Sequence, residues 1–292
     1  METAETKPAH KGLKKGLYVI PTAFTAANIA MGFLAVLSSL RGFQLIAINP
    51  EQAAIYFDYA AKGIAFAILF DTLDGRVARM TRTTTEIGVQ LDSLADVLTF
   101  GIAPIVLAYG WAFGATFSED NGFHGLGVFV LFMYLMCGAF RLARFNLQAT
   151  RPRVLIEGTP KVDKKNFVGL PIPAAAGLIA SIVHFAPQPI VSRGENLATI
   201  YNILLMILIG GLGLLMVSTL RYSSFKAAGR GKRSIYLLLV VAAIGMLFWL
   251  YSRYVMLAFG IVYVSHGIIW HFVGLLRPHS RNETVVVDEV QP

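Results

Sequence analysis

The chain is poor in cysteine and in charged residues. Cys137 is the only cysteine among 292 residues, which excludes an intrachain disulfide and a thiolate metal cluster. Charged residues make up 14% of the chain, whereas average soluble domains carry about 25%. Hydrophobic residues make up 55%, and the mean hydropathy is +0.62. These values predict an integral membrane protein with one lipid-embedded body.

A nucleic-acid partner is not expected, although the net charge is +8. The basic residues are spread over short segments between apolar runs, and no contiguous soluble region remains to bind nucleic acid. This distribution suits membrane orientation and anionic substrates instead.

The hydropathy pattern predicts an all-α fold, a polytopic membrane helix bundle. About eight runs approach the roughly 20 residues that a bilayer requires. Their approximate ranges are 19–40, 53–81, 88–116, 124–148, 168–189, 197–219, 234–251 and 254–276. We expect residues 1–220 to hold a six-helix catalytic core, and residues 221–292 to hold a basic linker, two further helices and a polar tail. His184, His266 and His271 lie near span ends without partners at metal-binding spacing, and are interpreted as structural or interfacial.

The distribution of Lys and Arg predicts the orientation. If the N-terminal tail is cytoplasmic, all but four of the 25 Lys and Arg residues fall on the cytoplasmic side. The four exceptions are Arg41, Lys62, Arg193 and Arg253. By the positive-inside rule, we expect both termini and the turn at 81–86 to be cytoplasmic, in a multi-pass protein of the cell membrane.

Four aspartates lie in or beside apolar segments on either side of the turn at 81–86. Asp71 and Asp74 are three residues apart, and Asp92 and Asp96 are four apart, so each pair occupies one face of a helix. Two antiparallel helices would oppose these faces, with Asp71 about 15 Å below the end of its helix. Carboxylates crowded together at a membrane edge repel one another and lose hydration, which costs free energy. Divalent cations could neutralise them, and ligands that are all oxygen atoms suit Mg²⁺ or Mn²⁺. Two such ions would balance four negative charges.

The spacing of the segment resembles the signature of the CDP-alcohol phosphotransferase family at eight fixed positions. These are Asp71, Asp74, Gly75, Ala78, Arg79, Gly88, Asp92 and Asp96. The resemblance implies that the first three aspartates bind metal and that the fourth is the catalytic base, also within reach of metal. Gly75, Ala78 and Gly88 leave room for a CDP ligand, and Arg79 offers donors to its diphosphate. Thr25 and Asn28, polar positions in the first span, are expected either to contact the nucleotide or to pack helices.

Three further stretches resemble the membrane-type phosphatidylserine synthases within that family: 91–104, 137–146 and 167–176. This resemblance implies CDP-diacylglycerol and L-serine as substrates, and a homodimer. Arg141 and Arg144, three apart, would bind the serine carboxylate, or would serve as positive-inside anchors or partners of lipid phosphate. Asn146 would complete a polar pocket or terminate the helix.

Other acceptors and one other class of function stay open from sequence alone. The same chemistry would serve glycerol 3-phosphate, an inositol phosphate or choline. A divalent-cation transporter would also use membrane aspartates, but it predicts polar residues across the whole bilayer depth. Here the aspartates crowd one half, which favours the transferase.

Overall fold

The computed structural model describes residues 11–81, 86–150, 166–218, 220–223, 251–267 and 269. Within these ranges, the side chains of residues 11–21, 78–79, 86, 148–150, 166–168 and 221–223 are not described. The predicted span at 234–251 and most of the predicted loop at 151–165 lie outside the described residues.

The described elements are predominantly helical, as predicted. In chain order they are α1 (Lys11–Leu45), α2 (Pro50–Thr81), α3 (Glu86–Asp96), η1 (Val97–Ile102), α4 (Ala103–Ala108), η2 (Tyr109–Phe113), α5 (Gly114–Thr116), α6 (Gly122–Thr150), β1 (Asn166–Val168), α7 (Ile172–Phe185), η3 (Ile190–Arg193), α8 (Glu195–Val217) and β2 (Arg221–Ser223). A further helix at 251–267, called the C-terminal helix below, carries no label in the figures.

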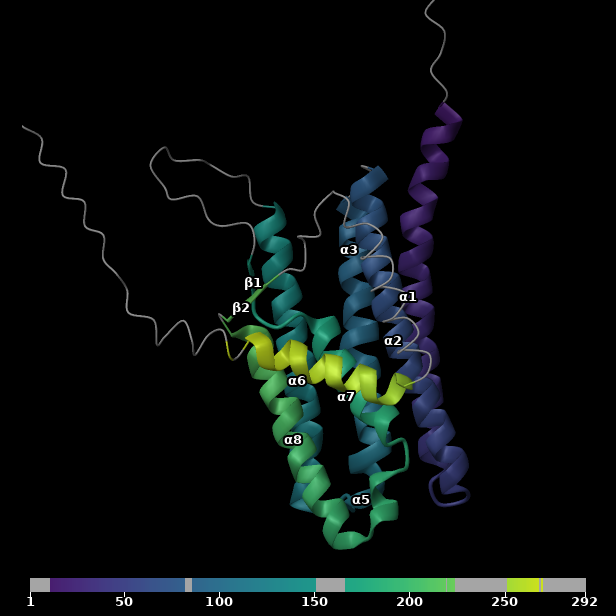
Figure 1. The fold of residues 1–292 in the computed structure, drawn as a ribbon, viewed down its shortest axis with the longest axis vertical. Helices are drawn as coiled ribbons and strands as arrows, with labels where there is room; N and C mark the ends of the chain where they lie inside the picture. Colours follow the sequence, from purple (N-terminus) through teal and green to yellow (C-terminus); the bar gives the residue numbers. More distant parts are fainter. Residues whose placement is uncertain are drawn as a thin grey trace, which may run out of the picture.

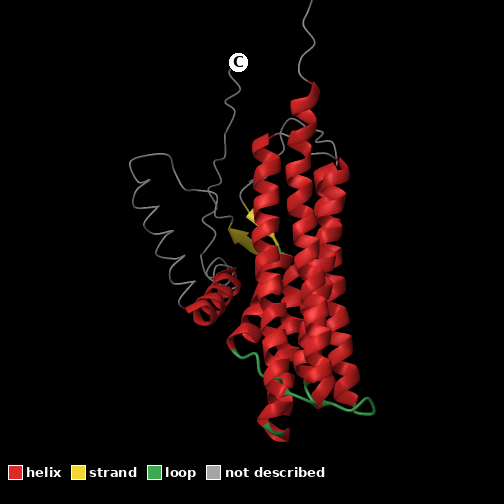
Figure 2. Ribbon diagram, turned by 90° about the vertical axis from the view of Figure 1, so that its right-hand side faces the viewer, coloured by secondary structure: helices red, strands yellow, loops and turns green. Residues whose placement is uncertain are grey.

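Five helical segments are long and apolar enough to cross a membrane: Thr22–Leu45, Pro50–Val77, Ile87–Thr116, Gly122–Leu147 and Glu195–Val217. They match five of the predicted spans to within a few residues. The long helices stand side by side in both views, with the start of α1, the end of α2 and the start of α3 at one end of the bundle and the α1–α2 turn at the other (Figures 1 and 2). These are the ends that the sequence predicts for them.

Small residues allow α1 to pack closely on its neighbours. A Cβ added at Gly63 of α2 would lie 3.2 Å from the Met31 carbonyl oxygen and 3.3 Å from Ala35 Cβ. A Cβ added at Gly32 would overlap Thr99 of η1, whose backbone Cα would be only 2.9 Å away. Close approach of helices through small residues is typical of membrane bundles. It brings α1 against both helices that carry the aspartates.

The helix α7 has only 14 residues, shorter than the predicted span at 168–189. Prolines explain both ends: Pro171 is the residue before the helix, and Pro187 follows it, where its ring would clash with a continuing helix. Trp111 of η2 donates its Nε1–H to the carbonyl oxygens of Ala186 and Gln188, at 3.1 and 2.9 Å. These bonds satisfy carbonyl groups of the loop that follows the helix.

A short antiparallel pair of strands departs from the purely helical prediction. β1 pairs with β2, with Asn166 opposite Ser223 and Val168 opposite Arg221. Gly169, which follows β1, has a φ of 84°, and a Cβ there would lie 2.3 Å from the Met216 carbonyl oxygen. Only glycine fits both the dihedral angle and the space. The pair joins the entry to α7 with the exit from α8.

The C-terminal helix crosses α7 in Figure 1, where it is yellow, and lies against the outside of the upright helices in Figure 2. The sequence predicts a membrane span at 254–276. The described part of that range is helical as far as residue 267. Its role as a span remains a prediction.

Candidate active site

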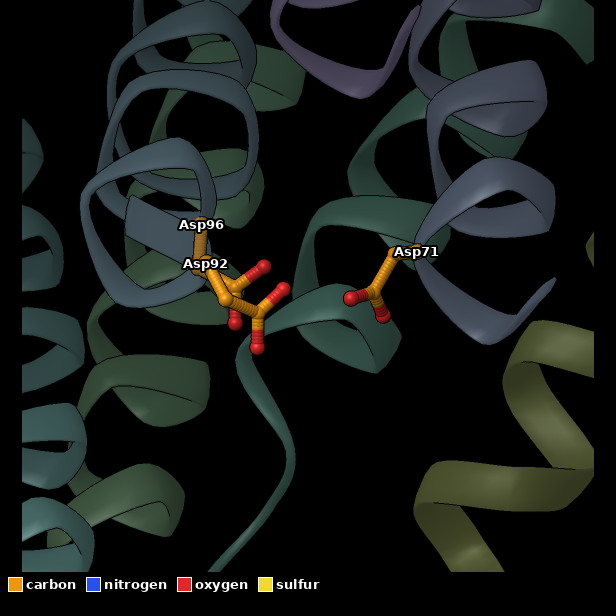
Figure 3. Close-up of side chains that lie close together, drawn as sticks. All are labelled: Asp71, Asp92 and Asp96. Carbon is orange, nitrogen blue, oxygen red and sulfur yellow. The ribbon is translucent and has the colours of Figure 1, made fainter. Parts of the chain in front are cut away.

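Three of the four predicted aspartates converge between α2 and α3. Asp71 projects from α2 toward Asp92 and Asp96, which project from α3 (Figure 3). One carboxylate oxygen from each lies within 4.8 Å of one from each of the others. Asp96 is buried, and Asp71 and Asp92 are half-buried. The spacing of three and four residues thus places carboxylates on facing sides of two helices, as expected.

Asp74, the remaining aspartate of the four, is buried and accepts a hydrogen bond from the Thr25 hydroxyl of α1. It still interacts electrostatically with both Asp92 and Asp96. Thr25 was predicted to contact the nucleotide or to pack helices. In the structure it joins α1 to the acidic site and fixes one oxygen of Asp74.

The cluster fits a divalent cation. Asp96 interacts electrostatically with Asp71, Asp92 and Asp74, which carry charge of the same sign. Its buried Oδ1 has no hydrogen-bond partner among the described residues. Unpaired buried carboxylates are costly unless a cation or a proton compensates them. Several carboxylate oxygens within one small volume are the donor set that Mg²⁺ and Mn²⁺ prefer.

A π-helical segment begins directly after Asp96. η1 extends over Val97–Ile102, and its Thr99 donates a hydrogen bond to the Asn28 carbonyl oxygen of α1 at 3.3 Å. Such segments are frequent at functional sites, because an extra residue in the turn redirects side chains. The Asn28 side chain is 1% exposed, and neither its oxygen nor its nitrogen has a partner among the described residues. A buried amide of this kind can bind a polar ligand.

The remaining predicted CDP-binding positions are less fully described. Gly75 is half-buried one residue after Asp74, and Gly88 is exposed near the start of α3. The side chains of Ala78 and Arg79 lie outside the described residues. Their predicted contacts with the diphosphate stay predictions.

The two predicted arginines differ in their surroundings. Arg141 of α6 is 8% exposed, interacts electrostatically with Asp96, and holds its guanidinium 4.7 Å above the Phe145 ring. Its Nε has no hydrogen-bond partner among the described residues. Arg144, three residues later, is exposed. Arg141 is therefore the arginine that borders the acidic site.

Asn146 connects α6 to the helix that carries Asp92 and Asp96. Its Nδ2 donates to the Ser93 hydroxyl at 2.9 Å. Sequence reasoning did not single out Ser93. The position of Ser93 next to Asp92 was the only local signal for such a role. Its hydrogen-bond partner, Asn146, is 53 residues away in the chain.

Comparisons with known proteins agree with the predicted resemblance. The profile of the CDP-alcohol phosphatidyltransferase family matches residues 18–209. A Helicobacter pylori protein named CDP-diacylglycerol–serine O-phosphatidyltransferase is 31% identical over 269 residues, or 92% of this chain and 98% of its own. A Methanocaldococcus jannaschii protein of the same name is 32% identical over 201 residues, which are 69% of this chain and 72% of its own.

An archaetidylserine synthase of Methanothermobacter thermautotrophicus is 35% identical over 164 residues, covering 56% of each chain. The range matched by the family profile contains the four aspartates, Arg141 and Asn146. The chain therefore belongs to the CDP-alcohol phosphatidyltransferase family.

Proposed function

We propose that the chain transfers the phosphatidyl group of CDP-diacylglycerol to the hydroxyl of L-serine, giving phosphatidylserine and CMP. The observation that carries the proposal is the placement of one buried arginine, Arg141, beside the aspartate cluster. The names of the similar proteins, which specify serine, support the same acceptor.

The carboxylates of Asp71, Asp92 and Asp96, with Asp74 beside them, would hold Mg²⁺ or Mn²⁺, two ions in our proposal. When bound, these ions would neutralise the diphosphate of the substrate. Asn28 and Thr25 on α1, with Gly75, Ala78, Arg79 and Gly88 around the turn, would surround the CDP group.

Asp96 would accept the proton of the serine hydroxyl through its partnerless Oδ1. The serine oxygen then forms a bond to the β-phosphorus of CDP-diacylglycerol, and the bond from that phosphorus to the oxygen of CMP breaks. CMP leaves with the electron pair, so the in-line displacement needs no covalent intermediate with the protein.

Arg141 would bind the serine carboxylate and thereby orient the hydroxyl toward Asp96. Serine carries a carboxylate that glycerol, inositol and choline lack, and a guanidinium with a free N–H suits a carboxylate. Phosphorylated acceptors are anionic too, so glycerol 3-phosphate and an inositol phosphate are the alternatives. Exposed Arg144 would contact lipid phosphate, and Asn146 would hold α6 against α3.

The proposed setting is the cell membrane, with both termini and the site facing the cytoplasm. The excess of Lys and Arg in the segments predicted to be cytoplasmic supports this orientation. A six-helix core and a C-terminal pair of spans, both expected from the apolar runs, and a homodimer, implied by the family resemblance, complete the proposal.

A panel of acceptors tests the proposed function. Purified protein with CDP-diacylglycerol and Mn²⁺ or Mg²⁺ is given labelled serine, glycerol 3-phosphate, inositol phosphate or choline, and CMP release and lipid product are measured. We expect CMP release with serine and with none of the other three acceptors. We expect this release to be lost when EDTA removes the divalent ions. Release with a different acceptor only would overturn the assignment of serine.

The two arginines provide a matched pair of variants. Arg141→Lys keeps the charge but loses the fork of donors, so we expect the KM for serine to rise about tenfold or more. Arg144→Lys makes the same change at an exposed position and should leave the KM near that of the wild type. Steady-state kinetics at saturating CDP-diacylglycerol measures both, and an equal response of the two variants would contradict the role given to Arg141.

A further inference from the structure

The helical segment Ile87–Thr116, called the aspartate helix below because it carries Asp92 and Asp96, contains Pro104. In a regular α-helix, the carbonyl oxygen of residue 100 accepts a hydrogen bond from the amide of residue 104. Proline has no N–H group, so the carbonyl of Phe100 in η1 lacks that donor. Phe100 is fully buried, where a carbonyl oxygen without a donor costs free energy. A donor from another helix is therefore required at this place.

Tyr134 of α6 supplies the donor. Its side chain is fully buried, and its hydroxyl donates to the Phe100 carbonyl oxygen at 3.1 Å. Beside this bond, a Cβ added at Gly101 would lie 2.8 Å from Leu135 Cδ1, so α6 packs directly on η1. Behind it, a Cβ added at Gly213 of α8 would lie 3.4 Å from Tyr134 Cα. Tyr134 therefore lies where α6 packs on both η1 and α8.

A second hydrogen bond joins α6 to the aspartate helix nearer the start of α3. Asn146 Nδ2 donates to the Ser93 hydroxyl at 2.9 Å. The two bonds pair residue 93 with 146 and residue 100 with 134, so the two helices run antiparallel. They fix the register of α6 on either side of Asp96.

The same two bonds indicate which helix faces meet. Asp96 is three residues after Ser93 and therefore shares the face that Ser93 turns toward α6. Arg141 is seven residues after Tyr134, about two helical turns, and therefore shares the face that Tyr134 turns toward the aspartate helix. Both side chains are buried, with Asp96 9% and Arg141 8% exposed. The register thus places the carboxylate and the guanidinium on facing helix sides, between the two hydrogen bonds.

We propose that Tyr134 is a positioning residue: its bond to the Phe100 carbonyl holds α6 in register with the aspartate helix, so that Arg141 stays opposite Asp96. The inference rests on the proposed function, in which Arg141 binds the serine carboxylate and Asp96 accepts the hydroxyl proton. Both groups must hold one small molecule, so a shift of α6 along the aspartate helix would misplace the hydroxyl. A misplacement of about 1 Å costs up to about 10²-fold in rate.

The test compares Tyr134→Phe with Tyr109→Phe in the full-length protein. Each substitution removes one hydroxyl, and Tyr109 lies further along the aspartate helix, with its hydroxyl 3.3 Å from His124 Nε2. For Tyr134→Phe we expect kcat/KM for serine to fall about tenfold or more. The KM for CDP-diacylglycerol and the affinity for Mn²⁺ should stay near those of the wild type, because the carboxylates of α2 and α3 are retained. Tyr109→Phe should keep wild-type values throughout.

A double variant and thermal unfolding separate positioning from support of the fold. If Tyr134 acts through Arg141, adding Tyr134→Phe to Arg141→Lys should lower kcat/KM for serine by much less than it does in the wild type. A lower melting temperature with unchanged kcat/KM for serine would overturn the inference, as would additive effects in the double variant or an equal loss of Mn²⁺ affinity. Failure of the proposed function itself is visible separately, as a wild-type protein that releases no CMP with serine.

Discussion

Asp96→Asn is expected to lower kcat by about 10²–10⁴-fold, the usual contribution of a positioned general base. Asparagine has nearly the same shape, so the packing of α3 against α6 should survive. Its amide cannot accept the hydroxyl proton of the acceptor, and the buried, unpartnered carboxylate loses its charge. The measurement is CMP release under saturating serine and CDP-diacylglycerol.

The control for this variant is Asp120→Asn, the same change at an exposed position in the turn between α5 and α6. It should retain wild-type turnover. A near-normal kcat in Asp96→Asn would remove Asp96 from the role of base, while loss of folded protein in size-exclusion chromatography would show that the substitution had disturbed the bundle instead.

Asp71→Asn is expected to weaken Mn²⁺ binding by more than about 100-fold, beyond the 10–100-fold cost of losing an outer-shell partner of a metal ligand. Asp71 is the one member of the three-carboxylate cluster that comes from α2. Its substitution therefore removes the α2 ligand of that three-carboxylate cluster. A titration of free Mn²⁺ by electron paramagnetic resonance measures the affinity without any turnover.

Thermal unfolding gives a second, independent reading of the same variant. A cation that binds only the folded protein raises its melting temperature. Mn²⁺ should therefore raise the melting temperature of the wild type and of Asp120→Asn, and have little effect on Asp71→Asn. An equal rise in all three proteins would contradict a metal site at this cluster.

The parts of the fold that the sequence predicts are those governed by local periodicity. Apolar runs of sufficient length predict five spans that the structure reproduces. Spacings of three and four residues predict that Asp71 meets Asp92 and Asp96, because such residues share one helix face. Pro171 and Pro187 carried a signal for the short α7, but the prediction of a span at 168–189 rested on hydropathy and did not use it.

The features that could not be predicted from the sequence depend on contacts between residues that are far apart in the chain. His184 finds Asp58 and Ser252 at separations of 126 and 68 residues, and Thr25 reaches Asp74 across 49. The burial of Arg141 and the exposure of Arg144 likewise depend on which neighbours cover each position, although both lie on a similar face of α6. No pattern within a single helix contains that information.

The buried thiol of Cys137 has a practical consequence for labelling. A thiol in apolar surroundings reacts slowly, and no other cysteine exists in the chain. The native protein is therefore already a low-background host for single introduced cysteines. Ile48 and Met80, which are 79% and 83% exposed, lie just before the start and near the end of α2. Because we propose that α2 crosses the bilayer, we expect a membrane-impermeant maleimide to label thiols at these two positions from opposite sides of the membrane.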